Sequence, residues 1–202
     1  MSRVVLFLNG QVPKKLPDLT QFVKIFCTDG AYKYLQKNGI QPDVISGDFD
    51  SYSKDLIPNE IEVVETPDQN FTDFEKALQL IKKRNYHEVY IYGSSGMEHD
   101  HFLGNLSAAV KFKNELNLLF FDDFSFYFFT DKQTELSGYL GRTISLYPFP
   151  VAKGITTEGL QYPLQNETLE ITQRIGTRNK VISEKVVINY QKGDLLLFIS
   201  NQ

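Results

Sequence analysis

Short apolar runs alternate with amphipathic stretches over the first two-thirds of the chain. Buried strands are predicted at residues 4–8, 22–28, 61–64, 87–92 and 116–121. Helical spacing of apolar residues predicts helices at 31–38, from Thr72 onward, and around Leu103, Leu106 and Val110. Asn38-Gly39 is a stop signal for the first helix, and Thr72 with Glu75 has the spacing of a capping box for the second. This β-α alternation predicts an α/β domain with a mostly parallel sheet and helices on both faces.

The pattern changes after about Thr130, where strand-like pieces dominate. They lie at residues 125–129, 142–147, 184–190 and 195–199, and Gln191-Lys192-Gly193-Asp194 predicts a hairpin between the last two. We expect an α/β domain at residues 1–132 and a small antiparallel β domain at residues 133–202. A unit of about 70 residues is marginal alone, so we expect it to lean on the first domain or on another subunit.

Composition and charge narrow the functional classes. The chain has 202 residues, of which 42% are hydrophobic and 23% charged, as in an ordinary soluble globular protein. A net charge of −4 argues against a protein that binds nucleic acid through a broad basic surface. It also argues against a polybasic protein that binds to membrane surfaces. No apolar run approaches the roughly 20 residues that span a bilayer, and the apolar start of the chain resembles a first strand more than a signal peptide.

The single cysteine indicates a compartment. Cys27 lies in the apolar run Ile25-Phe26-Cys27 and has no internal partner for a disulfide. We therefore expect a buried thiol in a reducing cytoplasm.

Acidic residues follow the predicted strands of the first domain. They are Asp29, Asp48, Asp50, Asp68, Asp73 and Asp100. In an open α/β sheet, ligands bind beyond the carboxyl ends of the strands, so one topology brings these loops together. Two such charges 4 Å apart repel by about 4 kcal/mol at an effective dielectric constant of 20, which calls for a cation or raised pKa values. Oxygen ligands favour Mg²⁺, and Mg²⁺ with carboxylates is typical of phosphoryl or nucleotidyl transfer.

Each local motif also has a structural interpretation. Asp48-Phe49-Asp50 is compatible with a surface turn, and Thr72 to Glu75 with a simple helix cap. The run Gly93 to Gly96 lacks the Gly-Lys-Ser/Thr of a Walker A loop. His99 and His101 flank Asp100 without a cysteine or glutamate ligand series, which does not favour zinc.

The order of the motifs resembles the thiamine pyrophosphokinase family. The matching blocks in the first domain are Asp29-Gly30-Ala31, residues 42–51 with Gly47-Asp48-Phe49-Asp50-Ser51, residues 66–78 with Thr66-Pro67-Asp68-Gln69 and Thr72-Asp73, Asp100-His101, and Gly104-Asn105-Leu106. Further blocks follow at residues 144–148, 157–164 and 176–179. The resemblance therefore spans nearly the whole chain.

The resemblance implies a fold and a reaction. The implied fold is a three-layer α/β nucleotide-binding domain followed by a β-sandwich domain that binds thiamine. Members of this family move the β,γ-pyrophosphate of ATP to the hydroxyethyl oxygen of thiamine and release AMP. They work with Mg²⁺ as homodimers, with thiamine between the subunits.

The same resemblance implies roles for particular residues. Asp48, Asp50 and Asp73 would hold Mg²⁺ and the ATP phosphates, supported by Asp29 and Gly30. Asp68 and Gln69 would shape the site, Thr72 would cap its helix near a phosphate, and Asp100 and His101 would line the nucleotide region. Asn179 would face thiamine across the dimer. Our own hypothesis for the mechanism is that Asp73 or Asp100 accepts the proton of the thiamine hydroxyl while Mg²⁺ stabilises the pyrophosphoryl group.

Two departures from the family pattern keep other functions open. Glu98 stands where the family usually has arginine, and Arg178 where it usually has serine. Lys76, Lys132 and Arg142 are candidates to restore the missing positive charge. The alternatives are a homologue that binds nucleotide or thiamine without turnover, and another Mg²⁺-dependent transferase that uses Asp48-x-Asp50 as a DxD motif.

Overall fold

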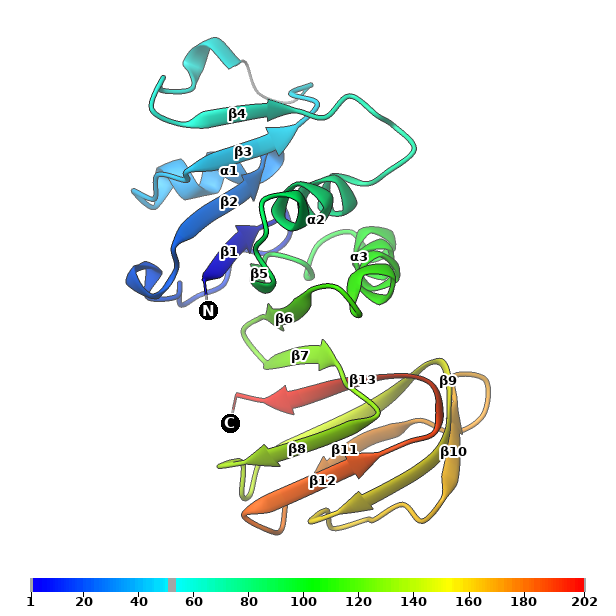
Figure 1. Cartoon of the computed structure of the whole chain (residues 1–202). Coiled ribbons are helices and arrows are strands. Elements are labelled where there is room, and N and C mark those ends of the chain that lie inside the picture. The colour runs from blue at the N-terminus through cyan, green and yellow to red at the C-terminus, as the bar shows by residue number, and fades with distance from the viewer. Residues whose placement is uncertain (1, 51–53, 202) are drawn as a thin grey trace. The chain divides into compact units, whose positions relative to one another are not determined.

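The computed structural model describes residues 2–50 and 54–201, which form two compact units, Met1–Asp123 and Phe124–Gln202 (Figure 1). Strand β7 (Ser125–Phe129) belongs to the second unit, so the division lies before the boundary that we expected at residue 132. Ser51, the last residue of the Gly-Asp-Phe-Asp-Ser motif, lies outside the described residues.

The first unit is built on a parallel sheet with the strand order β4-β3-β2-β1-β5-β6. Its strands are β1 (Arg3–Phe7), β2 (Lys24–Thr28), β3 (Val44–Gly47), β4 (Glu62–Glu65), β5 (Glu88–Tyr92) and β6 (Asn117–Phe121). Its helices are α1 (Asp29–Lys37), α2 (Asp73–Lys83) and α3 (His99–Phe112), with 3₁₀ turns at Leu19–Gln21 and Lys54–Leu56. The predicted parallel α/β arrangement is confirmed.

Successive residues of each strand serve opposite faces of this sheet. Phe7 and Cys27, which are register partners, pack in one cluster with Leu35 of α1. The neighbouring buried residues, such as Phe26 and Phe120, face the other way, and Phe120 makes an edge-to-face contact with Phe74 of α2. Helices therefore cover both faces, and both faces of the sheet are apolar, as a parallel sheet requires (Figure 1).

The helix signals in the sequence correspond closely to the helix ends. Asn38 is the C-cap of α1 and Gly39 follows with a φ of 68°, in the left-handed region that favours glycine. The capping box at the start of α2 is confirmed, because Thr72 accepts the Glu75 N–H and Glu75 accepts the Thr72 N–H. Helix α1 begins at Asp29, two residues before the predicted start, and the Asp29 carboxylate accepts the N–H of Gly30 in its first turn.

The second unit is an antiparallel β structure centred on one long strand, β9 (Thr143–Glu158). The other strands are β7, β8 (Gln133–Ser137), β10 (Glu167–Glu170), β11 (Gly176–Lys180), β12 (Lys185–Asn189) and β13 (Lys192–Ser200). Residues 144–153 of β9 pair with β13, whereas residues 156–158 pair with β12, so β9 belongs to two layers. The core between them contains Leu146 and Leu197 from one layer and Ile188 from the other. The predicted antiparallel domain is confirmed.

The predicted hairpin at residues 191–194 is wrong. Strands β12 and β13 pair with different parts of β9, and among the described residues no ladder joins them to each other. Gln191 donates its N–H to Lys153 of β9 instead, so the turn carries the chain from one layer to the other.

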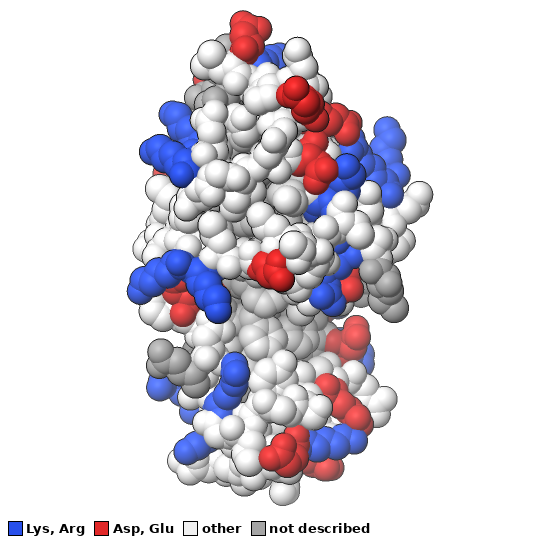
Figure 2. Space-filling model, turned by 90° about the vertical axis from the view of Figure 1, so that its left-hand side faces the viewer, with Lys and Arg blue, Asp and Glu red and all other residues white. Residues whose placement is uncertain are grey.

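The surface shows no preference for one sign of charge on the face drawn in Figure 2, where acidic and basic side chains are interspersed. Among the described residues, no helix is both long and apolar enough to cross a membrane.

Candidate active site

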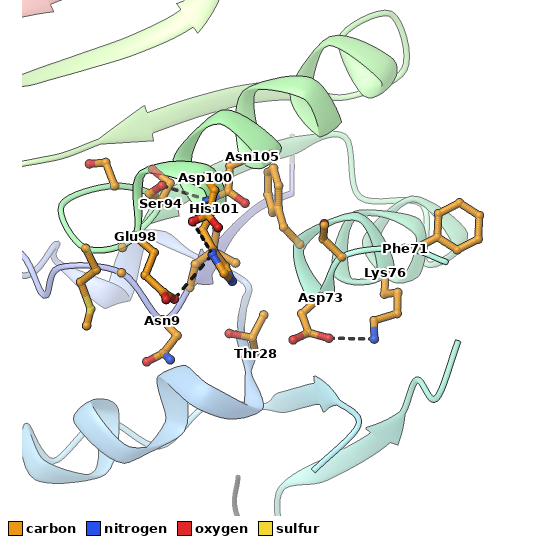
Figure 3. Close-up of a pocket in the computed structure, with 18 of the residues that line it drawn as sticks. Asn9, Thr28, Phe71, Asp73, Lys76, Ser94, Glu98, Asp100, His101 and Asn105 are labelled. Carbon is orange, nitrogen blue, oxygen red and sulfur yellow. Dashed lines mark hydrogen bonds and ion pairs between the residues drawn. The ribbon is translucent and has the colours of Figure 1, made fainter. Parts of the chain in front are cut away.

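A pocket of about 560 Å³ lies in the first unit at the carboxyl ends of the parallel strands. This volume is within the usual range for small-molecule sites. The lining comes from the segments after β1, β3, β4 and β5, the end of β2, and the first turns of α2 and α3. It includes Asn9, Thr28, Asp48, Gln69, Thr72, Asp73, Lys76, Ser94, Glu98, Asp100, His101 and Asn105 (Figure 3). The sequence analysis placed Asp48, Gln69, Thr72, Asp73, Asp100 and His101 in one site, and all six line this pocket.

Asp29 supports the pocket from behind and does not line it. Its buried carboxylate accepts the N–H of Gly30 at 2.7 Å and the N–H of Phe49 at 2.9 Å. Phe49 has a φ of 61°, which is unfavourable for a residue with a side chain, so this hydrogen bond stabilises a strained turn. The turn carries Asp48, and Asp29 therefore positions Asp48.

The carboxylates of this region interact electrostatically. The pKa of Asp29 is raised, mainly by burial and further by the negative charges of Asp73 and Asp48. The accumulated negative charge would be relieved by a cation, and oxygen atoms of carboxylates are the ligands that Mg²⁺ prefers. No three His, Cys, Asp or Glu side chains within the described residues are grouped closely enough to hold a metal by themselves.

Asp48 is held toward the segment between β4 and α2. Gln69 donates its side-chain N–H to Asp48 at 3.0 Å, and this bond is the main cause of a lowered Asp48 pKa. Asp50 and Asp68 are exposed and do not line the pocket. The Asp50 N–H donates to Asp48, whereas Asp68 accepts the backbone and side-chain N–H groups of Asn70.

The first turn of α2 presents an ion pair to the pocket. Lys76 lies 2.8 Å from the Asp73 carboxylate and donates a second hydrogen bond, also 2.8 Å, to the Thr66 carbonyl oxygen. The side chain of Lys76 is 6% exposed and that of Asp73 is 42% exposed. Asp73 is thus accessible to solvent, and the less exposed Lys76 lies beside it (Figure 3).

The start of α3 supplies the opposite wall. His101 contacts the carboxylates of Asp100 at 3.1 Å and Glu98 at 3.5 Å. The hydrogen bond with Asp100 raises the pKa of His101, and the same bond lowers the pKa of Asp100. Behind them, Asn105 donates to the Ser94 carbonyl oxygen at 2.9 Å and so ties the loop after β5 to α3.

Asn179 belongs to the second unit and is not among the residues that line this pocket. Its side chain accepts the Tyr162 N–H at 3.0 Å and donates to the Tyr162 carbonyl oxygen at 2.7 Å. The preceding residue, Arg178, is exposed, has a φ of 56° and donates its N–H to the Ser145 hydroxyl. This irregular segment interrupts the register between β11 and β9.

Comparisons with known proteins cover both units. Residues 19–120 match the family model described as thiamin pyrophosphokinase, catalytic domain, and residues 130–195 match the thiamin pyrophosphokinase, vitamin B1 binding domain. The chain belongs to the thiamine pyrophosphokinase family.

Individual relatives agree over nearly the full length. Thiamine pyrophosphokinase 1 of Oryza sativa subsp. japonica is 30% identical over 231 residues, covering 97% of this chain and 86% of the relative. Thiamine pyrophosphokinase 1 of Arabidopsis thaliana is 27% identical over 229 residues, with 97% and 85% covered. The crystal structure of the thiamine pyrophosphokinase from Bacillus subtilis matches the fold with a TM-score of 0.82 at 23% identity, covering 98% of each chain.

Of the three residues that were candidates for the missing positive charge in this thiamine pyrophosphokinase fold, one lies in the pocket lining and two do not. Lys76 lines the pocket. Lys132 and Arg142 lie in the second unit, where Lys132 donates to the Gly193 carbonyl oxygen and Arg142 to that of Ser200. Lys76 is therefore the lysine that shares the pocket with Glu98.

Sequence reasoning assigned no role in the site to several polar residues that line the pocket, among them Asn9, Thr28 and Ser94. Asn9 and Thr28 stand at the carboxyl ends of β1 and β2, so the rule that ligands bind there is a signal that could have found them. Lys76 was a candidate for the missing positive charge, but its burial was not predicted, because a lysine in an amphipathic helix is normally solvated.

Proposed function

We propose that the protein transfers the β,γ-pyrophosphate of ATP to the hydroxyethyl oxygen of thiamine, giving thiamine diphosphate and AMP. The supporting observation is that Asp48, Asp73 and Asp100 line one pocket at the carboxyl ends of the strands, in a member of this family. In the reaction the hydroxyl oxygen loses its proton and bonds to the β-phosphorus, the bond from that phosphorus to the α,β-bridging oxygen breaks, and AMP leaves with that oxygen.

The helix ends favour a phosphate-bearing ligand. Helices α2 and α3 both begin at the pocket, where Thr72 and Glu98 are their N-caps. Backbone N–H groups and the positive end of the helix dipole attract phosphate oxygens at such positions. Each helix therefore contributes to holding the triphosphate despite the acidic side chains around it.

The oxygen ligands of the pocket fit Mg²⁺. This ion takes one or two protein carboxylates and completes its shell with phosphate oxygens and waters, so it needs no cage of protein ligands. Asp48 and Asp73 would hold it from the pocket wall, and Asp50, which lies outside the pocket lining, would support them from the same turn as Asp48. When bound, Mg²⁺ neutralises phosphate charge and polarises the transferred group.

Two carboxylates are candidates for accepting the proton of the thiamine hydroxyl. One oxygen of Asp73 is held by Lys76, which leaves Oδ2 to accept a proton. Asp100 has a lowered pKa because of its hydrogen bond with His101, which makes it a weaker base. If Asp100 is the acceptor, replacing His101 by glutamine should move the acidic limb of the pH–rate profile, because the hydrogen bond that lowers the pKa of Asp100 is weakened.

Thiamine binding and assembly form the second half of the proposal. The protein works as a homodimer with thiamine at the subunit interface, near Gln69 of the first unit and Asn179 of the second. Support comes from exposed apolar side chains on neighbouring segments of the second unit, Leu140, Tyr162 and Ile182. The adjacent bridge between Leu160 and Val181 and the hydrogen bond from Gly141 to Val181 bring these segments together. Light scattering at micromolar concentration would give twice the 23.2 kDa chain mass if this is correct.

A cytoplasmic location completes the proposal. It is supported by the single free cysteine, Cys27, which is buried and has a pKa well above its usual range because of that burial. A reducing compartment keeps such thiols free.

The decisive test follows both products together. Purified protein is incubated with thiamine, ATP and Mg²⁺, and thiamine diphosphate and AMP are separated by chromatography. We expect equal amounts of the two, abolished by a chelator and reduced by at least about a hundredfold in Asp48→Asn. The matched control is Asp55→Asn, an exposed carboxylate outside the pocket, which should keep wild-type turnover. Release of ADP in place of AMP, or binding of ATP without product, would overturn the proposal.

A further inference from the structure

The pocket contains an ammonium group that is nearly buried. The Lys76 side chain is 6% exposed, and its ammonium contacts the Asp73 carboxylate and the Thr66 carbonyl oxygen. An ammonium has three N–H donors, so among the described residues one donor of Lys76 has no protein partner. Lys76 lines the pocket, which makes a ligand atom a possible partner for that donor.

The positive charge of Lys76 acts on the carboxylates of the pocket. It neutralises Asp73 directly. The pKa of Asp48 is lowered first by the hydrogen bond from Gln69 and also by the positive charge of Lys76. Lys76 thus acts on both of the pocket carboxylates that we propose as ligands of Mg²⁺.

A metal ion and Lys76 compete for Asp73. A divalent cation bound to this carboxylate removes the anionic partner of Lys76, and a buried ammonium without an anion is costly. The cost disappears if a new anion arrives, and the phosphate oxygens of ATP are the anions brought into this pocket by the proposed reaction.

We infer that Lys76 is an exchangeable counter-ion, which holds Asp73 in the metal-free pocket and transfers to a phosphate oxygen of the nucleotide when a divalent cation takes Asp73. The inference rests on the proposed function for the identity of the nucleotide. It makes metal and nucleotide binding mutually dependent through one side chain.

The test measures metal and nucleotide binding separately. Binding of Mn²⁺ without nucleotide is followed by electron paramagnetic resonance, and binding of ATP in the presence of a chelator by calorimetry. In Lys76→Met, Mn²⁺ should bind about tenfold more tightly and metal-free ATP about tenfold more weakly than in wild type. Lys76→Arg should stay closer to wild type in both. Lys83→Met, an exposed lysine at the end of the same helix, is the matched control and should change neither.

A second variant keeps the test valid if Lys76→Met does not fold. Asp73→Asn frees Lys76 from its anion, so metal-free ATP should bind more tightly than in wild type although turnover is lost. The inference is overturned if Lys76→Met weakens the binding of both Mn²⁺ and ATP, or changes the binding of neither. It is also overturned if Asp73→Asn does not strengthen the binding of metal-free ATP.

Failure of the inference is distinguishable from failure of the proposed function. Tighter Mn²⁺ binding together with weaker metal-free ATP binding in Lys76→Met would support the counter-ion exchange. If the wild-type protein at the same time forms no thiamine diphosphate, the pyrophosphokinase reaction is rejected. If the wild-type protein forms thiamine diphosphate but Lys76→Met does not show these changes in Mn²⁺ and ATP affinity, only the counter-ion exchange is rejected.

Discussion

The carboxylate of Asp29 occupies the space in which a side chain at Gly47 would begin. A Cβ atom on Gly47 would lie 2.3 Å from the Asp29 Cγ, closer than real Cβ contacts. The same carboxylate accepts the Phe49 N–H, and Asp48 lies between these two positions. Gly47 and Asp29 thus form a matched pair that sets the direction of Asp48.

This pairing predicts that Gly47→Ala reduces the free energy of unfolding by about 1–3 kcal/mol, because the new methyl group displaces a buried carboxylate. Urea denaturation measures the change. The cost should be clearly smaller in an Asp29→Ala background, since the atoms that clash are then absent. Equal costs in the two backgrounds would mean that Asp29 is not the reason for glycine at this position.

A second glycine, Gly104, faces open space in the pocket wall. A Cβ there meets nothing within 4 Å, although Gly104 lies inside α3. Gly104→Ala should therefore raise stability by up to about 1 kcal/mol through helix propensity. Gly104→Leu should fold but weaken ATP binding at least about tenfold, because its side chain extends into the pocket. Unimpaired ATP binding in the folded Leu variant would place the nucleotide elsewhere.

The protonation of His101 gives a pH-dependent prediction. Its pKa is raised above the ordinary 6.5 by the hydrogen bond with Asp100 and by the charges of Glu98 and, from α2, Asp73. Protonated His101 stabilises the folded state fully at pH values below its ordinary pKa of 6.5. This contribution is lost as the pH rises through the higher pKa that His101 has in the folded state. An NMR titration should show the pKa of His101 lowered by Glu98→Gln and lowered further by Asp100→Asn. Glu60→Gln, an exposed glutamate in another segment, should not move it.

Asn179 gives a prediction for the second unit. Asn179→Ala removes two hydrogen bonds to the Tyr162 backbone, so we expect a loss of about 1–2 kcal/mol in the free energy of unfolding. If thiamine binds beside it, the KM for thiamine should rise while the KM for ATP stays unchanged. Gln165→Ala replaces an exposed amide of the same unit and serves as the control. A rise in the KM for ATP alone would contradict the assignment of thiamine to this region.

The elements that the sequence predicted correctly have strong local signals. The buried runs of β1, β2, β5 and β6 alternate with the amphipathic α2, whose capping box is visible in four residues. Strand β3 was missed as a strand, because its four buried residues, Val-Ile-Ser-Gly, are too few to show a period. Strand β11, Gly-Thr-Arg-Asn-Lys, has no apolar residue, and its place is determined by pairing with β9.

The sequence could predict which carboxylates gather at the candidate site, because the sheet topology brings the loops that carry them to one edge. Asp73 and Asp100 each come after a predicted strand, and the carboxyl ends of parallel strands share one edge. Asp48 follows β3, which was missed as a strand, so its motif and not a predicted strand end indicated it. Whether a carboxylate faces the pocket or lies behind it depends on burial and partners. Asp29 is turned toward two backbone N–H groups, a fact that its position after β2 does not indicate.

Strand β9 pairs with β10, β11, β12 and β13. The backbone of each of these strands is thus protected from solvent partly through the same sixteen residues. Partial opening of the second unit cannot release β9 without exposing edges on all four neighbours. Amide hydrogens of these four strands should therefore exchange with deuterium in one cooperative event, as a single foldon.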